Sequence, residues 1–100
     1  MALRTREDSA PDRVALLEPC IELEPGHAFV HHHLGLSWLE WPERTTVTSA
    51  RAITNLDRAT QLAPGYAGFH QGLAQALATA SDGAGALGAI ERAVALDSGW

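Results

Sequence analysis

The chain has 100 residues, enough for one small domain with a modest core. Hydrophobic residues make up 46% of it and charged residues only 19%, which excludes bulk disorder. Seven arginines, no lysine and twelve carboxylates give a net charge of −5 without a basic block, and this argues against nucleic acid as a partner.

The first helix is expected to run from a cap at Ser9 to about Glu24, after a flexible polar tail at residues 1–8. Pro11 in the first turn and an acid three residues after Ser9 are typical of a helix start. Apolar residues at helical spacing predict one buried face: Val14, Leu17 and Ile21, with Leu16, Cys20 and Leu23 as further candidates.

Two more helices are predicted in the middle of the chain. The second covers about residues 27–40, and its inward row is Val30, Leu34, Trp38 and Trp41. Residues 43–47 are polar and rich in β-branched side chains, which predicts a loop. Thr48 or Ser49 is expected to cap a third helix that ends at Ala63, with a buried side of Ala52, Ile53, Leu56, Ala59 and Leu62.

The last two helices are predicted at about residues 66–80 and from a capped turn at residues 81–83 to about residue 97. Their apolar stripes are Phe69, Leu73, Ala74 and Leu77 on the fourth helix, and Leu87, Ile90, Val94 and Leu96 on the fifth. Proline, with or without glycine, ends each of the first three helices. No segment alternates with a period of two for long enough to predict a strand, so an all-α chain of antiparallel helices is expected.

The chain also repeats itself. A leucine followed by a breaker, a glycine and a ring occurs at residues 23–27, 62–66 and 96–100. The three leucines are 39 and 34 residues apart, and a period in this range indicates stacked helix-turn-helix units. Small residues recur in both complete units, where helix backbones must approach closely: Gly35 and Ala74, Ala52 and Ala86, and Ala59 and Ala93.

This pattern resembles the tetratricopeptide repeat (TPR), W-x2-L-G-x2-Y, A-x3-F, P. The corresponding residues are His31, Leu34, Gly35, Trp38, Ala52, Leu56 and Pro64 in one unit, and His70, Leu73, Ala74, Leu77, Ala86, Ile90 and Ser98 in the next. The resemblance implies a right-handed antiparallel helix-turn-helix stack, a TPR-like α-solenoid of about five helices. It divides a single domain, residues 9–100, into a capping half-repeat at 9–25, a repeat with a turn insertion at 26–64, and a repeat at 65–100.

Departures from the family pattern fall at three places. Histidine replaces the favoured tryptophan in both units, and five extra residues lengthen the first unit within the turn at 41–47. Arg13 stands where the two full units have alanine. Because no helix of its own unit precedes Arg13, a charge is acceptable there, and Leu17 and Cys20 are expected to face the next unit from an N-terminal capping helix.

The resemblance also implies a concave groove lined by the first helix of each unit. It maps onto Phe29, His32, His33, Leu36, Glu40, Gln71, Gln75 and Thr79. Phe29, Leu36 and Leu39 are apolar on a face that the core is not expected to need. We therefore predict a module that binds a peptide or protein; the alternative is the N-terminal repeat region of a larger enzyme, such as a sulfotransferase or glycosyltransferase, without activity of its own.

The fifth helix is expected to expose an apolar face, because the second helix of each unit normally packs on a following unit. That face comprises Leu87, Ile90, Val94 and Trp100. It predicts either a homodimer through the C-terminal helix or a missing continuation of the repeats.

Catalysis, cofactors and metals find little support in the sequence. Residues 83–88 match G-x-G-x-x-G, but a helical segment precedes them and no acid follows at about twenty residues, so we expect close helix packing rather than dinucleotide binding. Five histidines diverge in the repeat register, so no native metal site is predicted. No catalytic residue, cofactor or enzyme activity is expected.

The single cysteine and the lack of an apolar span predict the cellular setting. Cys20 alone cannot form an intramolecular disulfide, and in its helical slot a buried structural thiol is expected. No stretch approaches the roughly 18 apolar residues of a membrane span, and no apolar run follows the charged N-terminus. A cytoplasmic protein without membrane contact is predicted.

Overall fold

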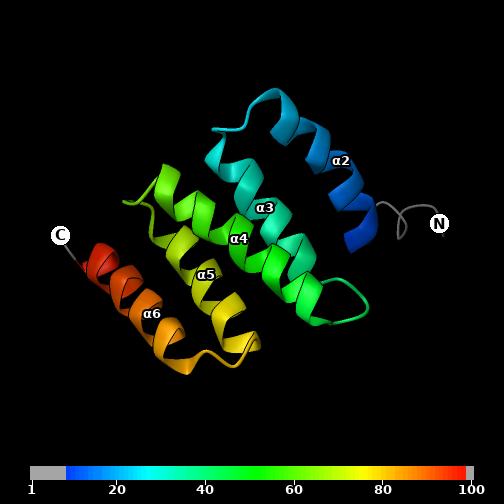
Figure 1. Cartoon of the computed structure of the whole chain (residues 1–100). Coiled ribbons are helices and arrows are strands. Elements are labelled where there is room, and N and C mark those ends of the chain that lie inside the picture. Colours follow the sequence, from blue (N-terminus) through cyan, green and yellow to red (C-terminus); the bar gives the residue numbers. More distant parts are fainter. Residues whose placement is uncertain (1–8, 99–100) are drawn as a thin grey trace, which may run out of the picture.

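The computed structural model describes residues 9–98, with side chains to residue 96, as five α-helices (Figure 1). They are α2 (Ala10–Leu23), α3 (Ala28–Leu39), α4 (Thr46–Leu62), α5 (Ala67–Thr79) and α6 (Gly83–Ser98). This part of the chain contains no strand, so the all-α prediction is confirmed. None of the five helices is long and apolar enough to cross a membrane. The predicted tail at 1–8 lies outside the described residues.

Polar side chains cap the N-terminus of four of the five described helices, α2, α3, α4 and α6. The Ser9 hydroxyl accepts a hydrogen bond from the Asp12 backbone N–H (3.3 Å), which confirms the predicted cap of α2. The side chain of Asp82 likewise accepts from the Gly85 N–H (3.0 Å) at the start of α6. At α3 the ring of His27 has this role, because its Nδ1 accepts from the Val30 N–H at 3.4 Å.

The predicted cap of α4 is wrong by three or four residues. Thr45 is the N-cap: its hydroxyl accepts from the Thr48 N–H (3.1 Å), and the Thr48 hydroxyl accepts from the Thr45 N–H (3.0 Å). This reciprocal pair is a capping box in which threonine replaces the usual Glu or Gln. Thr48 is therefore the partner of the cap rather than the cap itself, and the helix takes in residues 46 and 47 of the expected loop.

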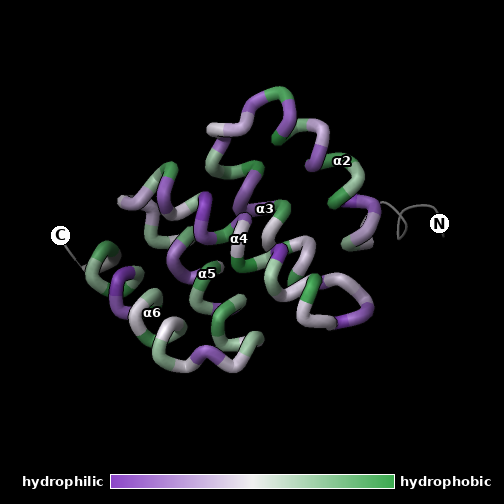
Figure 2. The backbone as a smooth tube through the Cα atoms, viewed as in Figure 1, coloured by the Kyte–Doolittle hydropathy of each residue, from purple (hydrophilic) through white to green (hydrophobic). Residues whose placement is uncertain are grey.

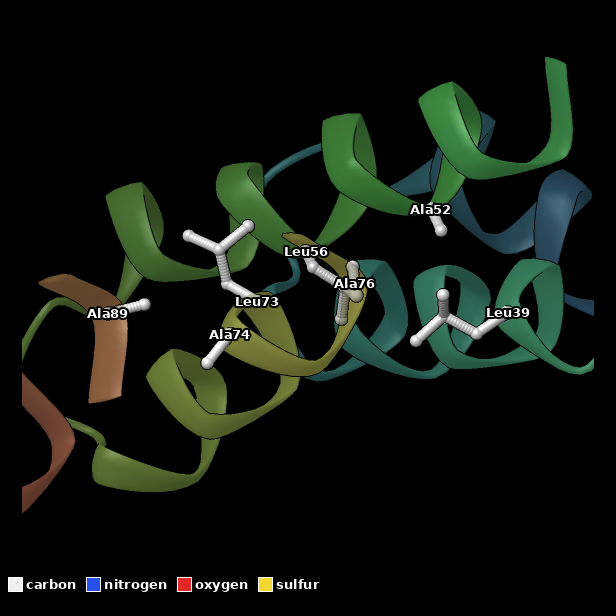
Figure 3. Packing of buried hydrophobic residues seen from close by; sticks show 7 residues of the cluster. All are labelled: Leu39, Ala52, Leu56, Leu73, Ala74, Ala76 and Ala89. Carbon is white, nitrogen blue, oxygen red and sulfur yellow. The ribbon is translucent and has the colours of Figure 1, made fainter. Parts of the chain in front are cut away.

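The helices pack as successive neighbours, α2 on α3, α3 on α4, α4 on α5 and α5 on α6 (Figure 1). Their shared core contains Leu39, Ala52, Leu56, Leu73, Ala74, Ala76 and Ala89 (Figure 3). Ala52, Ala59, Ala86 and Ala93 are all buried, as expected for slots where helices approach closely. Leu39 is buried too, so the prediction that the core does not need it is wrong.

Gly35 marks the closest approach between α3 and α4. A Cβ built on it would lie 2.5 Å from Cγ of Leu56 and 3.1 Å from the backbone oxygen of Ala52. Leu56 is fully buried and cannot move aside. The glycines of α6 differ, because a Cβ on Gly83 or Gly88 would meet nothing within 4 Å. The small residues that let α6 pack closely are therefore its buried alanines, Ala86 and Ala89, rather than these two glycines.

The two repeat histidines are buried and hold the turn that precedes their own helix. Nε2 of His31 lies 2.7 Å from the Pro25 oxygen, and Nε2 of His70 lies 2.8 Å from the Pro64 oxygen. A ring N–H that donates to a turn carbonyl explains why histidine can replace the larger tryptophan. The second ring nitrogen of His31 lies 3.3 Å from Asn55 Oδ1, whereas that of His70 is buried without a hydrogen-bond partner.

α2 is covered on one side only, which corrects two expectations. Cys20 is an exposed free thiol rather than a buried one, and Leu16 and Leu23 are exposed as well, because α3 is the only one of the described helices that packs on α2. Val14 is buried, as predicted. Arg13 reaches across to α3, where its Nε donates to the Ser37 hydroxyl (3.2 Å) and its guanidinium pairs with Glu40.

We expect Gly35→Ala to destabilise the fold and Gly88→Ala to stabilise it. The first change forces a methyl into Leu56, at a cost of about 1–3 kcal/mol, which exceeds the gain in helix propensity of at most about 1 kcal/mol. The second makes no clash and keeps that gain. Urea unfolding of both variants measures whether the free energy of unfolding falls or rises relative to the wild type. A Gly35→Ala protein as stable as Gly88→Ala would contradict the close approach of α3 and α4.

Candidate functional site

Aromatic rings gather where the first turns of α3 and α5 meet. We call Phe29, His32, Tyr66 and Phe69 the aromatic cluster. Phe69 lies 5.0 Å from Phe29, 4.5 Å from Tyr66 and 4.9 Å from His32, measured between ring centroids. The Phe29 and Tyr66 rings meet edge to face at 5.3 Å.

The cluster has a buried base and an exposed rim. Phe69 is 0% exposed, whereas Phe29 is 46% and Tyr66 48% exposed. Tyr66 is the N-cap of α5, and its ring lies over Gly68, where a Cβ would come within 2.9 Å of Tyr66 Cε2. The rings of Phe29 and Tyr66 are therefore held by Phe69 and by each other, while about half of each ring remains open to a partner.

His32 and His33 continue the rim along α3. His32 is half-buried against Phe69, and His33 is exposed with its ring centroid 5.6 Å from that of His32. Burial, followed by the charge of His33, lowers the pKa of His32 below its ordinary value. Nδ1 of His32 is buried and has no hydrogen-bond partner. The neutral ring is therefore the form that fits this site.

The next two predicted groove residues of α3 have partners within the chain. Leu36 is half-buried and packs against the core. Glu40 is exposed but pairs with Arg13 of α2. Neither side chain is as available to a partner as Phe29 and His33 are.

The predicted groove residues of α5 lie elsewhere. Gln71 and Gln75 line a hollow of about 290 Å³ between α5 and α6, and we call it the terminal hollow; its other lining residues are Ala74, Ala78, Ile90, Ala93 and Val94. Thr79 lines a separate hollow beside Thr45 and Ile53 at the start of α4. Of the eight predicted residues, Phe29, His32 and His33 thus lie at the aromatic cluster. The three residues of α5 line two other hollows, and Leu36 and Glu40 have partners within the chain.

The predicted self-association face is partly described. Leu87, Ile90 and Val94 are all exposed, and two of them line the terminal hollow together with Gln71 and Gln75. Two surfaces that the sequence suggested separately therefore meet in one hollow. Trp100 lies outside the described residues.

Sequence reasoning missed two ring residues and a stacked pair. Tyr66 is expected only as the first residue of a helix and Phe69 only on its buried stripe, although a ring after each Pro-Gly pair is a visible signal of a residue held at a helix start. Trp41 stacks on Trp38 with ring centroids 4.6 Å apart, and the Arg51 guanidinium lies 5.0 Å above the Trp38 ring. This stack fixes the beginning of the turn insertion.

The histidines of the described chain do not form a metal site. Between residues 9 and 96, no group of three or more His, Cys, Asp or Glu side chains is arranged to hold an ion. His27 and His31, the pair one turn apart, instead bind the Val30 N–H and the Pro25 oxygen.

A further hollow of about 530 Å³ lies beside His70, lined also by Asp57, Gln61 and Arg92.

No family model matches the sequence, and no curated protein sequence matches it. Eleven chains of solved structures match. One of them, titled "MamA MSR-1 C2", superposes with a TM-score of 0.72 at 24% sequence identity, over 84% of this chain and 45% of that one. That neighbour is a TPR-containing protein, and the likeness shows that this chain has a TPR-like helical-repeat fold. The chain spans less than half the length of that neighbour.

We expect His32 to make the fold less stable in acid. Its pKa is lowered in the folded state, so the unfolded chain binds the proton more readily, and the stability that His32 provides above pH 6.5 is lost as the pH falls below that value. His32→Gln, which places in α3 the residue that α5 has at Gln71, should flatten the change in melting temperature between pH 7.5 and 5.5. His33→Gln is the matched control and should flatten it less; equal slopes for wild type and His32→Gln would contradict the assignment.

Proposed function

We propose that this chain is a protein-interaction module, rather than an enzyme, and that it binds a peptide or protein partner with the rim of the aromatic cluster. The observation that carries the proposal is the contrast between buried Phe69 and half-exposed Phe29 and Tyr66. Rings with one side fixed and one side open lose little conformational entropy on binding, and aromatic residues are enriched among the residues that dominate binding energy. The TPR-like fold supports the proposal as an analogy of architecture.

The surroundings of the rim favour a ligand that combines apolar side chains with a hydrogen-bonding group at one edge. His33 is exposed next to the half-buried His32, so this part of α3 adds an imidazole that can donate or accept a hydrogen bond. Glu40, which also belongs to the predicted groove, is paired with Arg13. The apolar rings would supply affinity, and His33 would supply a polar contact at the edge.

The test uses a random twelve-residue peptide library on phage, selected against the immobilised chain. Peptides that bind the rim should lose at least about tenfold in affinity when Phe29→Ala or Tyr66→Ala removes a ring, since truncating a hot-spot residue costs about 2 kcal/mol or more and tenfold corresponds to about 1.4 kcal/mol. Val47→Ala removes an equally exposed apolar side chain from the start of α4 and is the control. Circular dichroism should show the helical content unchanged in all three variants.

Selected peptides that bind both ring variants as tightly as the wild type would count against the aromatic cluster as the binding surface. Failure to select any peptide, with the wild-type chain shown to be folded, would count against the proposed function.

A further inference from the structure

The terminal hollow has a counterpart inside the chain. The repeat places α5 at a shift of 39 residues from α3, and α6 at a shift of 34 residues from α4. The lining of the terminal hollow therefore corresponds to seven residues of the first unit: His32, Gly35, Leu36, Leu39, Leu56, Ala59 and Thr60. In the first unit, this surface is not empty.

α5 occupies the first-unit surface. Gly72 of α5 lies so close that a Cβ on it would be 2.8 Å from Cε1 of His32 and 3.3 Å from Cδ2 of Leu56. Phe69, one turn earlier on α5, lies 4.9 Å from the His32 ring. The occupant thus presents a glycine at the closest approach and a large apolar side chain beside it.

The presence of α5 accounts for a large difference in burial between equivalent residues. Leu56 is 0% exposed where α5 covers it, whereas Ile90, its counterpart in the second unit, is 47% exposed. Thr60 is 7% exposed, and its counterpart Val94 is 56% exposed. Hydrophobic positions recur along α6 (Figure 2), and in the described structure no helix follows it (Figure 1).

The residues that line the terminal hollow determine which side chains of a bound helix can fit against it. It contains no charged residue, and its floor is the buried methyl groups of Ala74 and Ala93. Gln71 and Gln75 are exposed and present neutral amides along one wall. A small residue can approach such a floor, apolar side chains can cover Ile90 and Val94, and a charge would lose water without gaining a partner.

We propose that the terminal hollow docks an α-helix of a partner protein whose contact face has the chemistry of α5: glycine or alanine at the closest approach, flanked by large apolar residues and without charge. The internal repeat supplies the template, because the same surface one unit earlier holds a helix of this kind. The inference goes beyond the proposed function, since it concerns a hollow between α5 and α6 and a helical ligand, and it does not require the aromatic cluster at the starts of α3 and α5.

The experiment uses a synthetic peptide of residues 66–80, acetylated and amidated, added to the isotope-labelled chain. Nuclear magnetic resonance detects weak binding, which is needed because an isolated helix of this length is only marginally formed. Chemical-shift changes should be confined to the terminal hollow, with Ala74, Ala78, Ala93 and Val94 among them. They should disappear in Ile90→Glu and remain in Val47→Glu, a matched change of an exposed apolar residue on α4.

A second peptide tests the close approach itself. With Gly72→Leu, the leucine side chain would meet the floor of the hollow, and binding should weaken at least tenfold. The Phe29→Ala chain should bind the original peptide as well as the wild type does, which separates a failure here from a failure of the proposed function.

Three results would overturn the proposal. One is the absence of shifts at millimolar peptide, and another is shifts centred on His32 and Leu56, which would mean that the peptide exchanges with α5. The third is a concentration-dependent change at Ile90 and Val94 without peptide, which would assign the terminal hollow to a second copy of the chain.

Discussion

The architecture depends on how closely three helices approach around Leu56. This fully buried side chain of α4 lies against Gly35 of α3, where a Cβ would come within 2.5 Å of Leu56 Cγ. It also lies beside Gly72 of α5, where a Cβ would be 3.3 Å from Leu56 Cδ2 and 2.8 Å from His32 Cε1. Close packing of this kind fixes helix positions, because an interior at near-crystalline density transmits a shift of one side chain to its neighbours. The two pairs of helices are joined through this point, and the aromatic rings at the starts of α3 and α5 come together because of it.

The same constraint shapes both ends of the described stack. At the beginning, α2 supplies Val14 to the core and replaces a packing alanine with Arg13, whose hydrogen bond and ion pair hold α3. At the end, α6 repeats the apolar pattern of α4, and its outward residues remain exposed. The first described helix is thus held on α3 by polar contacts, whereas the last one leaves an apolar hollow beside α5.

Periodicity and small-residue spacing predicted the five helices and their shared core, because both follow from which face of each helix is buried. Three features were beyond such reasoning. Cys20 has a helical slot but no second neighbour to bury it, and the cap of α4 was misplaced because threonine serves at both positions of its capping box. Leu36 of the predicted groove packs on the core and Glu40 pairs with Arg13, and such contacts between helices are not contained in the spacing along one helix.

The central claim is that α5 packs on the surface formed by α3 and α4 with Gly72 at the contact. Nuclear Overhauser effects in the labelled chain measure this directly. The account predicts cross-peaks from the Gly72 α protons to the Hε1 ring proton of His32 and to a methyl group of Leu56, because one α proton points to the place that a Cβ would occupy, 2.8 Å from Cε1 of His32 and 3.3 Å from Cδ2 of Leu56. A folded chain in which Gly72 shows neither cross-peak would contradict the packing, and with it the equivalence between the first-unit surface and the terminal hollow.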